Sequence, residues 1–234
     1  MRPWTIIALL TVFVAFSACQ APKPVHDVTP SGFLGPDVVA KLTHGGPEGP
    51  AWIYNNPDAK WASYDKMLLD PVTFWMAPGS KDQGISQAER QKLVDYFYRV
   101  IYNTMSKHVT MVSAPGSGVM RVRVALTKAE PSVVALDVIS TVVPQAAVLS
   151  SLKDAITGKP AFVGEAQVAV KVTDSVSGEL LAAWVASRVG GKRLDAAQLS
   201  SWGDVEQAMR FWADSAAYRL CKVQKRQGCQ PPKH

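Results

Sequence analysis

The chain has 234 residues, of which 47% are hydrophobic and 19% charged, and its formal net charge is +6. This length and composition suit one globular domain with a core of its own. The charges are mixed along the chain and lack the dense Lys/Arg clusters of nucleic-acid binders, so we expect no nucleic-acid partner.

The first eighteen residues have the three parts of an export signal. Arg2 supplies a positive charge, residues 4–16 form an apolar run, and two small residues precede Cys19. The run is shorter than the roughly 20 residues that a membrane-spanning helix needs. We therefore predict a cleaved signal peptide at residues 1–18.

Cys19 stands where the cysteine of a bacterial lipobox stands, although Phe16 replaces the usual leucine. In lipoproteins a dedicated peptidase cuts before a cysteine that carries diacylglycerol and a further acyl chain such as palmitate, enough for stable anchoring. The alternative is ordinary secretory cleavage after Ser17. Residues 19–30 contain three prolines and no apolar periodicity, so we predict a lipid anchor and tether there.

The two remaining cysteines, Cys221 and Cys229, are separated by seven residues. An oxidising compartment favours a disulfide between them, which would close a short loop and clip a tail to the domain, with free thiols as the alternative. The spacing does not fit a C-x-x-C redox motif or a zinc site, and we expect no metal or other cofactor.

Residues 31–64 form an aromatic-rich leader broken by Gly and Pro. Its rings need burial, so we predict a segment wrapped over the main body, with a ligand platform for glycan or lipid as the alternative. Next comes "YDKMLLDPVTFWM", a strand candidate in which Pro71 favours an edge or a bulge.

Later segments show regular periodicity. Ser86 and Glu89 form a capping box before a helix over 86–108, and strands follow at 109–114 and 119–127. Residues 161–189 predict a hairpin that turns at Ser177-Gly178, and a short helix can follow Pro144.

A second amphipathic helix begins at Ser201 and ends near Cys221. The predicted fold is α+β: a two-layer sandwich with a mostly antiparallel sheet and two amphipathic helices on one face. The domain covers residues 31–222, and residues 223–234 form a basic tail.

Six segments resemble the proteobacterial lipoproteins of the domain-of-unknown-function family 3313. They are "SGFL" at 31–34, "LDPVT" at 69–73, "PGSGVMRVRVALT" at 115–127, "FVGEAQV" at 162–168, "DSVSGELLAA" at 174–183 and "SWGDVEQAMRFWA" at 201–213. The resemblance implies an outer-membrane lipoprotein that faces the periplasm, and Gln20 is compatible with that sorting. It implies no reaction and no catalytic residue.

The residues themselves do not predict an enzyme. The four histidines fall in the tether, the leader, a helix end and the last position, away from any candidate nucleophile, and "GSG" at 116–118 lacks the spacing of a nucleophile elbow. We expect no catalytic site. An unrecognised envelope hydrolase and a carrier of a hydrophobic ligand are the alternatives, and the carrier requires leader aromatics that line a cavity.

We expect instead a binding or assembly module of the cell envelope. The sheet face away from the helices would present Arg121, Arg123, Lys171 and Arg188 as a shallow basic surface, with Gln167 beside them. Guanidinium groups suit carboxylates and phosphates, so an acidic envelope protein, peptidoglycan or a lipid head group would dock there. The alternative is a solvated strand face whose charges have cross-strand partners such as Glu165.

Overall fold

The computed structural model describes residues 23–76, 84–131, 164–190 and 202–232. Its strands in these ranges are β1 Lys23–Val25, β2 Thr43–His44, β3 Trp52–Asn55, β4 Lys66–Leu69, β5 Thr73–Phe74, β6 Thr110–Val112, β7 Val119–Glu130, β8 Glu165–Asp174 and β9 Leu180–Val189. The helices are α1 Pro36–Val39, α2 Gln87–Met105 and α5 Gly203–Val223, with short 3-10 turns η1 Gly32–Leu34 and η2 Trp61–Ser63. The predicted α+β class is confirmed.

All described strands belong to one mixed sheet. Its order is β2-β3-β9-β8-β7-β4-β6, with β1 also paired to β9 and β5 to β7. The central strands β7, β8 and β9 are antiparallel, as predicted, whereas β4 and β5 run parallel to β7. The parallel pairs arise because α2 separates β4 from β6 and returns the chain in the same direction.

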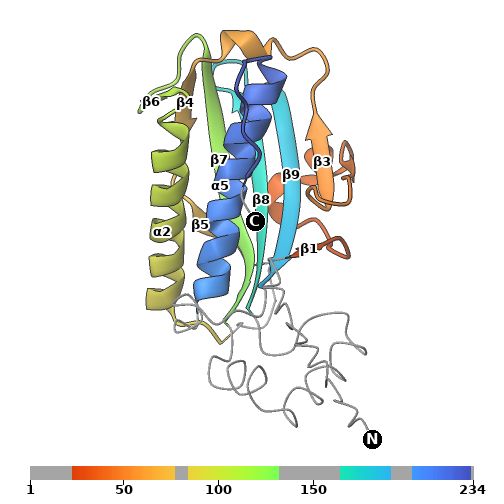
Figure 1. The fold of residues 1–234 in the computed structure, drawn as a ribbon, viewed down its shortest axis with the longest axis vertical. Coiled ribbons are helices and arrows are strands. Elements are labelled where there is room, and N and C mark those ends of the chain that lie inside the picture. Colours follow the sequence, from red (N-terminus) through yellow and green to blue (C-terminus); the bar gives the residue numbers. More distant parts are fainter. Residues whose placement is uncertain (1–22, 77–83, 132–163, 191–201, 233–234) are drawn as a thin grey trace, which may run out of the picture.

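Helices α2 and α5 lie side by side on one face of this sheet (Figure 1). The capping box predicted at the start of α2 is present: the Oγ of Ser86 accepts from the amide of Glu89, whose carboxylate accepts from the amide of Ser86. Both helices bury the apolar faces predicted from their periodicity against alternate residues of β7 and β8. The buried helical side chains include Leu93, Phe97, Ile101, Met105, Val205, Met209, Trp212 and Leu220.

The β8–β9 hairpin turns where the sequence predicts. Asp174 accepts hydrogen bonds from the amides of Val176 and Ser177 and from the hydroxyl of Ser177, while Gly178 has a φ of 73°. An Asp side chain that satisfies the turn amides, followed by glycine in the left-handed region, is a common way to end a strand. The turn joins β8 and β9, which have ten residues each and pair along most of their length.

For Pro71 the sequence predicted an edge strand or a bulge. Pro71 interrupts the segment between β4 and β5: β4 lies inside the sheet, between β7 and β6, whereas β5 pairs with β7 alone among the described strands. The amide of Asp70 still donates to the carbonyl of Val122, and Pro71 has no amide with which to continue the ladder. The break leaves Asp70 at the end of β4, beside β7.

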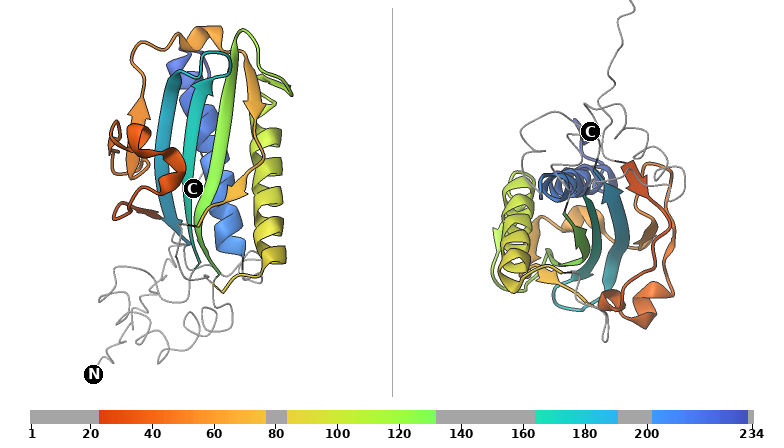
Figure 2. Two further views of the ribbon diagram at one scale, coloured as in Figure 1. Left: turned by 180° about the vertical axis from the view of Figure 1, so that it is seen from behind. Right: turned by 90° about the horizontal axis from the view of Figure 1, so that it is seen from below.

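The N-terminal segment covers the sheet face opposite α2 and α5 (Figure 2). Leu34 and Val38 pack against Ala183 and Val185 of β9, with Trp52 and Tyr54 at the margin. The first part of the predicted leader therefore lies over the body, whereas Thr43–His44 and Trp52–Asn55 extend the edge of the sheet as β2 and β3. The face opposite the helices is therefore only partly open, because β8 and β9 are covered there.

The predicted tether is too long at its C-terminal end. Lys23–Val25 pair with Ser187–Val189 of β9, and the indole of Trp52 donates to the carbonyl of Val28 over 2.6 Å. Backbone pairing along an open strand edge stabilises this segment despite Pro24, whose missing amide is tolerated at an edge. Residues 23–30 therefore belong to the folded body.

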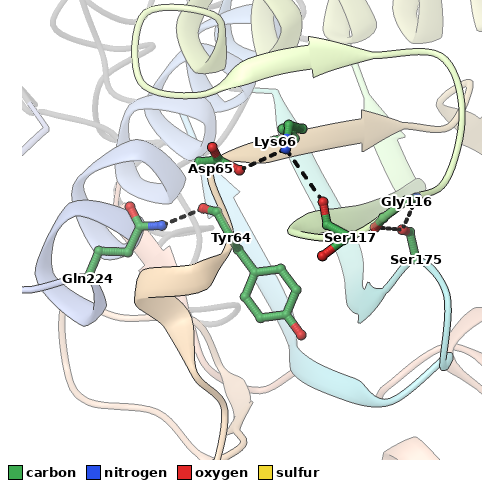
Figure 3. A network of polar contacts seen from close by, with 7 residues as sticks. All are labelled: Tyr64, Asp65, Lys66, Gly116, Ser117, Ser175 and Gln224. Atoms are coloured by element: carbon green, nitrogen blue, oxygen red, sulfur yellow. Dashed lines mark hydrogen bonds and ion pairs between the residues drawn. The ribbon is translucent and has the colours of Figure 1, made fainter.

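The C-terminal tail is also tied to the domain. Gln224 donates to the carbonyls of Trp61 and Tyr64, the latter drawn in Figure 3, and Arg226 donates to the carbonyl of His108. The predicted disulfide Cys221–Cys229 is present, with Cα atoms 5.7 Å apart. The folded unit thus extends past the predicted boundary at 222.

Some predictions fall outside the described residues: the signal peptide at 1–18, Cys19 and the short helix after Pro144. Within the described ranges, no helix has the length and apolar character needed to span a bilayer.

Candidate functional site

Three of the four predicted basic residues lie together on the sheet face away from α2 and α5. Arg121 and Arg123 project from β7, and Lys171 of β8 is directly opposite Arg123 in the ladder. Their neighbours Met120, Val122 and Val124 point into the core on the other side. We call Arg121, Arg123 and Lys171, with Asp70 and Phe33, the basic surface.

Asp70 is the carboxylate of this surface. The Nε of Arg121 lies 3.0 Å from each of its carboxylate oxygens, and Nη2 lies 2.8 Å from Oδ2. The hydrogen bond and the charge of Asp70 raise the pKa of the Arg121 guanidinium. Both arginine side chains keep 49% of their surface exposed, so this exposed pair contributes little stability but holds Arg121 in one orientation.

Arg123 is held more loosely. Its Nε lies 3.9 Å from Oδ2 of Asp70, and its guanidinium carbon lies 5.6 Å from the ring centre of Phe33 in η1. Among these groups three cations face one carboxylate, which leaves two formal positive charges in excess. The surface can therefore accept a further anionic group without displacing Asp70.

Polar atoms without partners lie at the border of the basic surface. The ring of Phe33 packs edge-on against Trp75, with ring centres 6.0 Å apart. The Nε1 of Trp75 and the Oγ of Ser31 are buried with no hydrogen-bond partner among the described residues. Buried polar groups normally have hydrogen-bond partners, so these two atoms mark the border as a place that can take up a further polar contact.

The prediction for Arg188 is wrong. Arg188 is opposite Ala166, on the face that α5 covers, and is only 3% exposed. Its guanidinium carbon stacks 3.6 Å above the ring of Phe211, and burial lowers its pKa to about 10 despite the attraction of Glu48. Strand β9 has apolar residues on both of its faces. The sequence therefore shows no alternation of polar and apolar residues from which the face of Arg188 could be predicted.

Glu165 is not the partner of the two arginines. It lies at the other end of β8, where its carboxylate accepts from Lys128 over 3.0 Å and from the hydroxyl of Ser187 over 3.1 Å. Burial opposes the charge of Lys128, but hydrogen bonds to Glu165 and Glu130 outweigh it and raise the pKa of this lysine. Gln167 donates to the carbonyl of Thr29 over 3.4 Å and so holds the N-terminal segment.

Sequence reasoning missed Asp70 and Phe33 as members of the surface. A signal was available, because both lie in segments that carry the family resemblance, "LDPVT" and "SGFL", and the arginines lie in a third. Three such segments, far apart in the sequence, meet at one place on the molecule.

The histidines are dispersed within the described residues. His26 contacts the carbonyl of Pro47, His44 stacks on Trp52 with ring centres 3.9 Å apart, and His108 follows the end of α2. No group of three His, Cys, Asp or Glu side chains in the described ranges has the arrangement of a metal site.

The chain matches one protein-family model over most of its length. The model for a protein family of unknown function, DUF3313, matches residues 29–216. The chain belongs to this family. The match spans all six segments on which the resemblance rests, including those that form the basic surface.

Solved structures give only distant likenesses. The PelC dodecamer from Paraburkholderia phytofirmans matches with 10% identity and a TM-score of 0.38, covering 75% of this chain and 96% of that one. Protein XCC0632 from Xanthomonas campestris, of family DUF330, matches with 12% identity and a TM-score of 0.42, covering 73% and 92%. Similarities at this level say nothing about the function of this chain. The search of curated proteins found no match.

Proposed function

We propose that this DUF3313 protein is a non-catalytic binding module of the cell envelope, held on the periplasmic side of the outer membrane by lipid on Cys19, and that its basic surface binds an acidic partner protein. The observation that carries the proposal is the meeting of Phe33, Asp70, Arg121 and Arg123, from three separate family segments, at one exposed place. A purely structural ion pair would need only Asp70 and one arginine.

The geometry favours recognition of carboxylates on a protein surface. The side chains project from adjacent strands of a sheet, and the guanidinium of Arg121 is pre-oriented by a two-point contact with Asp70. Arg123 and Lys171 face each other across the ladder and can contact one acidic group together. Exposed charge of one sign also speeds association with an acidic partner.

The test compares capture of partner proteins by purified variants, quantified by mass spectrometry at low and moderate salt. We expect Arg123→Gln with Lys171→Gln to lose capture of acidic proteins roughly tenfold, because two charge-assisted contacts disappear. Arg99→Gln removes an exposed arginine of α2 and serves as the matched control.

Asp70→Asn distinguishes an effect on partner binding from an effect on stability, because the two should change in opposite directions. Removal of the competing carboxylate raises the excess positive charge, so we expect capture of the same acidic protein to increase while thermal stability falls slightly. Unchanged capture in both the double variant and Asp70→Asn would overturn the proposal. Preferential retention of anionic vesicles or peptidoglycan, with no acidic protein, would replace the protein partner with one of those ligands.

A further inference from the structure

An apolar cavity of about 90 Å³ lies between α5 and the sheet, on the side opposite the basic surface. Phe97 and Met105 of α2, Trp212 of α5 and Trp184 of β9 line it, together with Trp61 of η2. Gln224 holds the backbone of η2 in place through the carbonyl of Trp61. The cavity is therefore built from elements spread along the described chain, from η2 to α5.

The cavity opens toward the β3 edge of the sheet. The lining residues from α2, β7 and β8 are buried, whereas some from β3, η2, β9 and α5 reach the surface. Asn55 and Val223 are exposed, and Trp61, Trp184, Ala216 and Arg219 are partly exposed. Ala216, Arg219 and Val223 are the lining residues of α5 that reach the surface, so the mouth lies along the C-terminal half of that helix, which Figure 1 shows in front of the sheet.

Arg219 is the cation at this mouth. It also lines a smaller adjacent hollow with Glu48 and Arg188, where the charge of Glu48 acts on Arg188. Among the described residues no hydrogen bond or ion pair of Arg219 is found, and burial lowers its pKa with no acidic group opposing. A desolvated guanidinium is costly unless an anion pairs with it.

The size of the cavity limits the ligand. An engineered core cavity of about 150 Å³ takes up benzene, so 90 Å³ suits the end of one hydrocarbon chain better than the two chains of a membrane phospholipid. Aromatic walls with one cation at the entrance match a chain that ends in an anionic head group.

We propose that the DUF3313 protein binds a single-chain anionic amphiphile here, with the chain end among Trp61, Trp184 and Trp212 and a carboxylate or phosphate head group paired with Arg219. This site is separate from the basic surface and does not depend on the proposed protein partner.

Photolabelling tests the site with the full processed chain in nanodiscs of zwitterionic lipid. Three ten-carbon probes carry a diazirine at the chain end: decanoic acid, decyl phosphate and the neutral alcohol decanol. We expect one or both anionic probes to label peptides that line the cavity, and decanol to label them weakly. The more strongly labelling head group shows whether the natural ligand is a fatty acid or a phosphate lipid.

Variants of α5 test whether the labelling depends on the proposed contacts. Arg219→Gln should reduce anionic labelling roughly tenfold and leave decanol labelling unchanged, because it removes one charge-assisted contact, and Arg219→Lys should restore part of it. Ala216→Phe narrows the mouth and should reduce labelling by all three probes. Arg99→Gln is the matched control and should label as the parent does.

Thermal melts establish that each variant is folded. If Ala216→Phe does not fold, Ala216→Leu takes its place. The proposal is overturned if decanol labels the cavity as strongly as the anionic probes, if the adducts map outside the lining residues, or if folded Arg219→Gln keeps full anionic labelling.

Discussion

Among single residues, three carboxylates each hold a local arrangement through several contacts or a buried hydrogen bond. Asp70 orients Arg121, Asp174 closes the β8–β9 turn, and Asp204 accepts from the amide of Gly164 inside the domain. A Cβ on Gly190 would lie 2.1 Å from the carboxyl carbon of Asp204, so only glycine fits there. Asp70 and Asp204 thus connect segments that are far apart in the sequence, whereas the amide contacts of Asp174 are local.

Asp174 gives a pH-dependent prediction. Amide hydrogen bonds from Ser177, then Val176, and the hydroxyl of Tyr64 lower the pKa of this carboxyl, although desolvation opposes them. Because the folded pKa lies below the unfolded one, the stabilisation is present above the unfolded value near 4 and is lost as pH falls through the folded value.

Asp174→Asn should therefore reduce the free energy of unfolding by about 1 kcal/mol at pH 7, a modest amount because the turn is exposed. Urea unfolding from pH 7 to pH 2 should show the parent and the variant converge below pH 4. A constant difference across that range would show that Asp174 does not act through its charge.

At the scale of elements, local signals predicted local structure. The capping box and apolar stripe located α2, alternation located β7, and the turn residues located the β8–β9 hairpin. The parallel placement of β4 between β7 and β6 was not predictable, because strand pairing across α2 depends on contacts distant in sequence. Membership of Asp70 and Phe33 in the basic surface escaped prediction for the same reason.

The disulfide belongs to the end of α5. It joins Cys221 in the last turn of that helix to Cys229 in the tail. Replacement of both cysteines by serine should lower the free energy of unfolding by about 2–3 kcal/mol at most, because the closed loop is short. Hydrogen exchange should rise in the last turn of α5 and not in α2.

Reductant provides the control for this prediction, since it should destabilise the parent and leave the double variant unchanged. An unfolding midpoint that is the same in both proteins, with and without reductant, would contradict a stabilising role for the disulfide.

At the scale of the whole molecule, the two candidate sites lie on opposite sides of one sheet. The basic surface lies on the face that the N-terminal segment partly covers, and the cavity lies under α5. The first strand, β1, begins at Lys23, only four residues after Cys19. If Cys19 carries lipid, the folded body is therefore held close to its membrane.

Lipidation of Cys19 is testable in cells. With an alkyne analogue of palmitate we expect label on the parent, which floats with outer-membrane vesicles in a density gradient. Cys19→Ser should lose the label and pass to the soluble fraction after a carbonate wash. An unlabelled parent whose mature N-terminus is Ala18 would instead establish ordinary secretory cleavage.

Binding of an acidic protein by the basic surface is best tested by photo-crosslinking in intact cells. A photoreactive residue is placed at position 171, which faces Arg123 across the ladder, and at position 99, which is exposed on α2. We expect one acidic envelope protein to be crosslinked at position 171 and not at position 99. Uncrosslinked monomer at 171, in a protein that remains on the membrane, would contradict it.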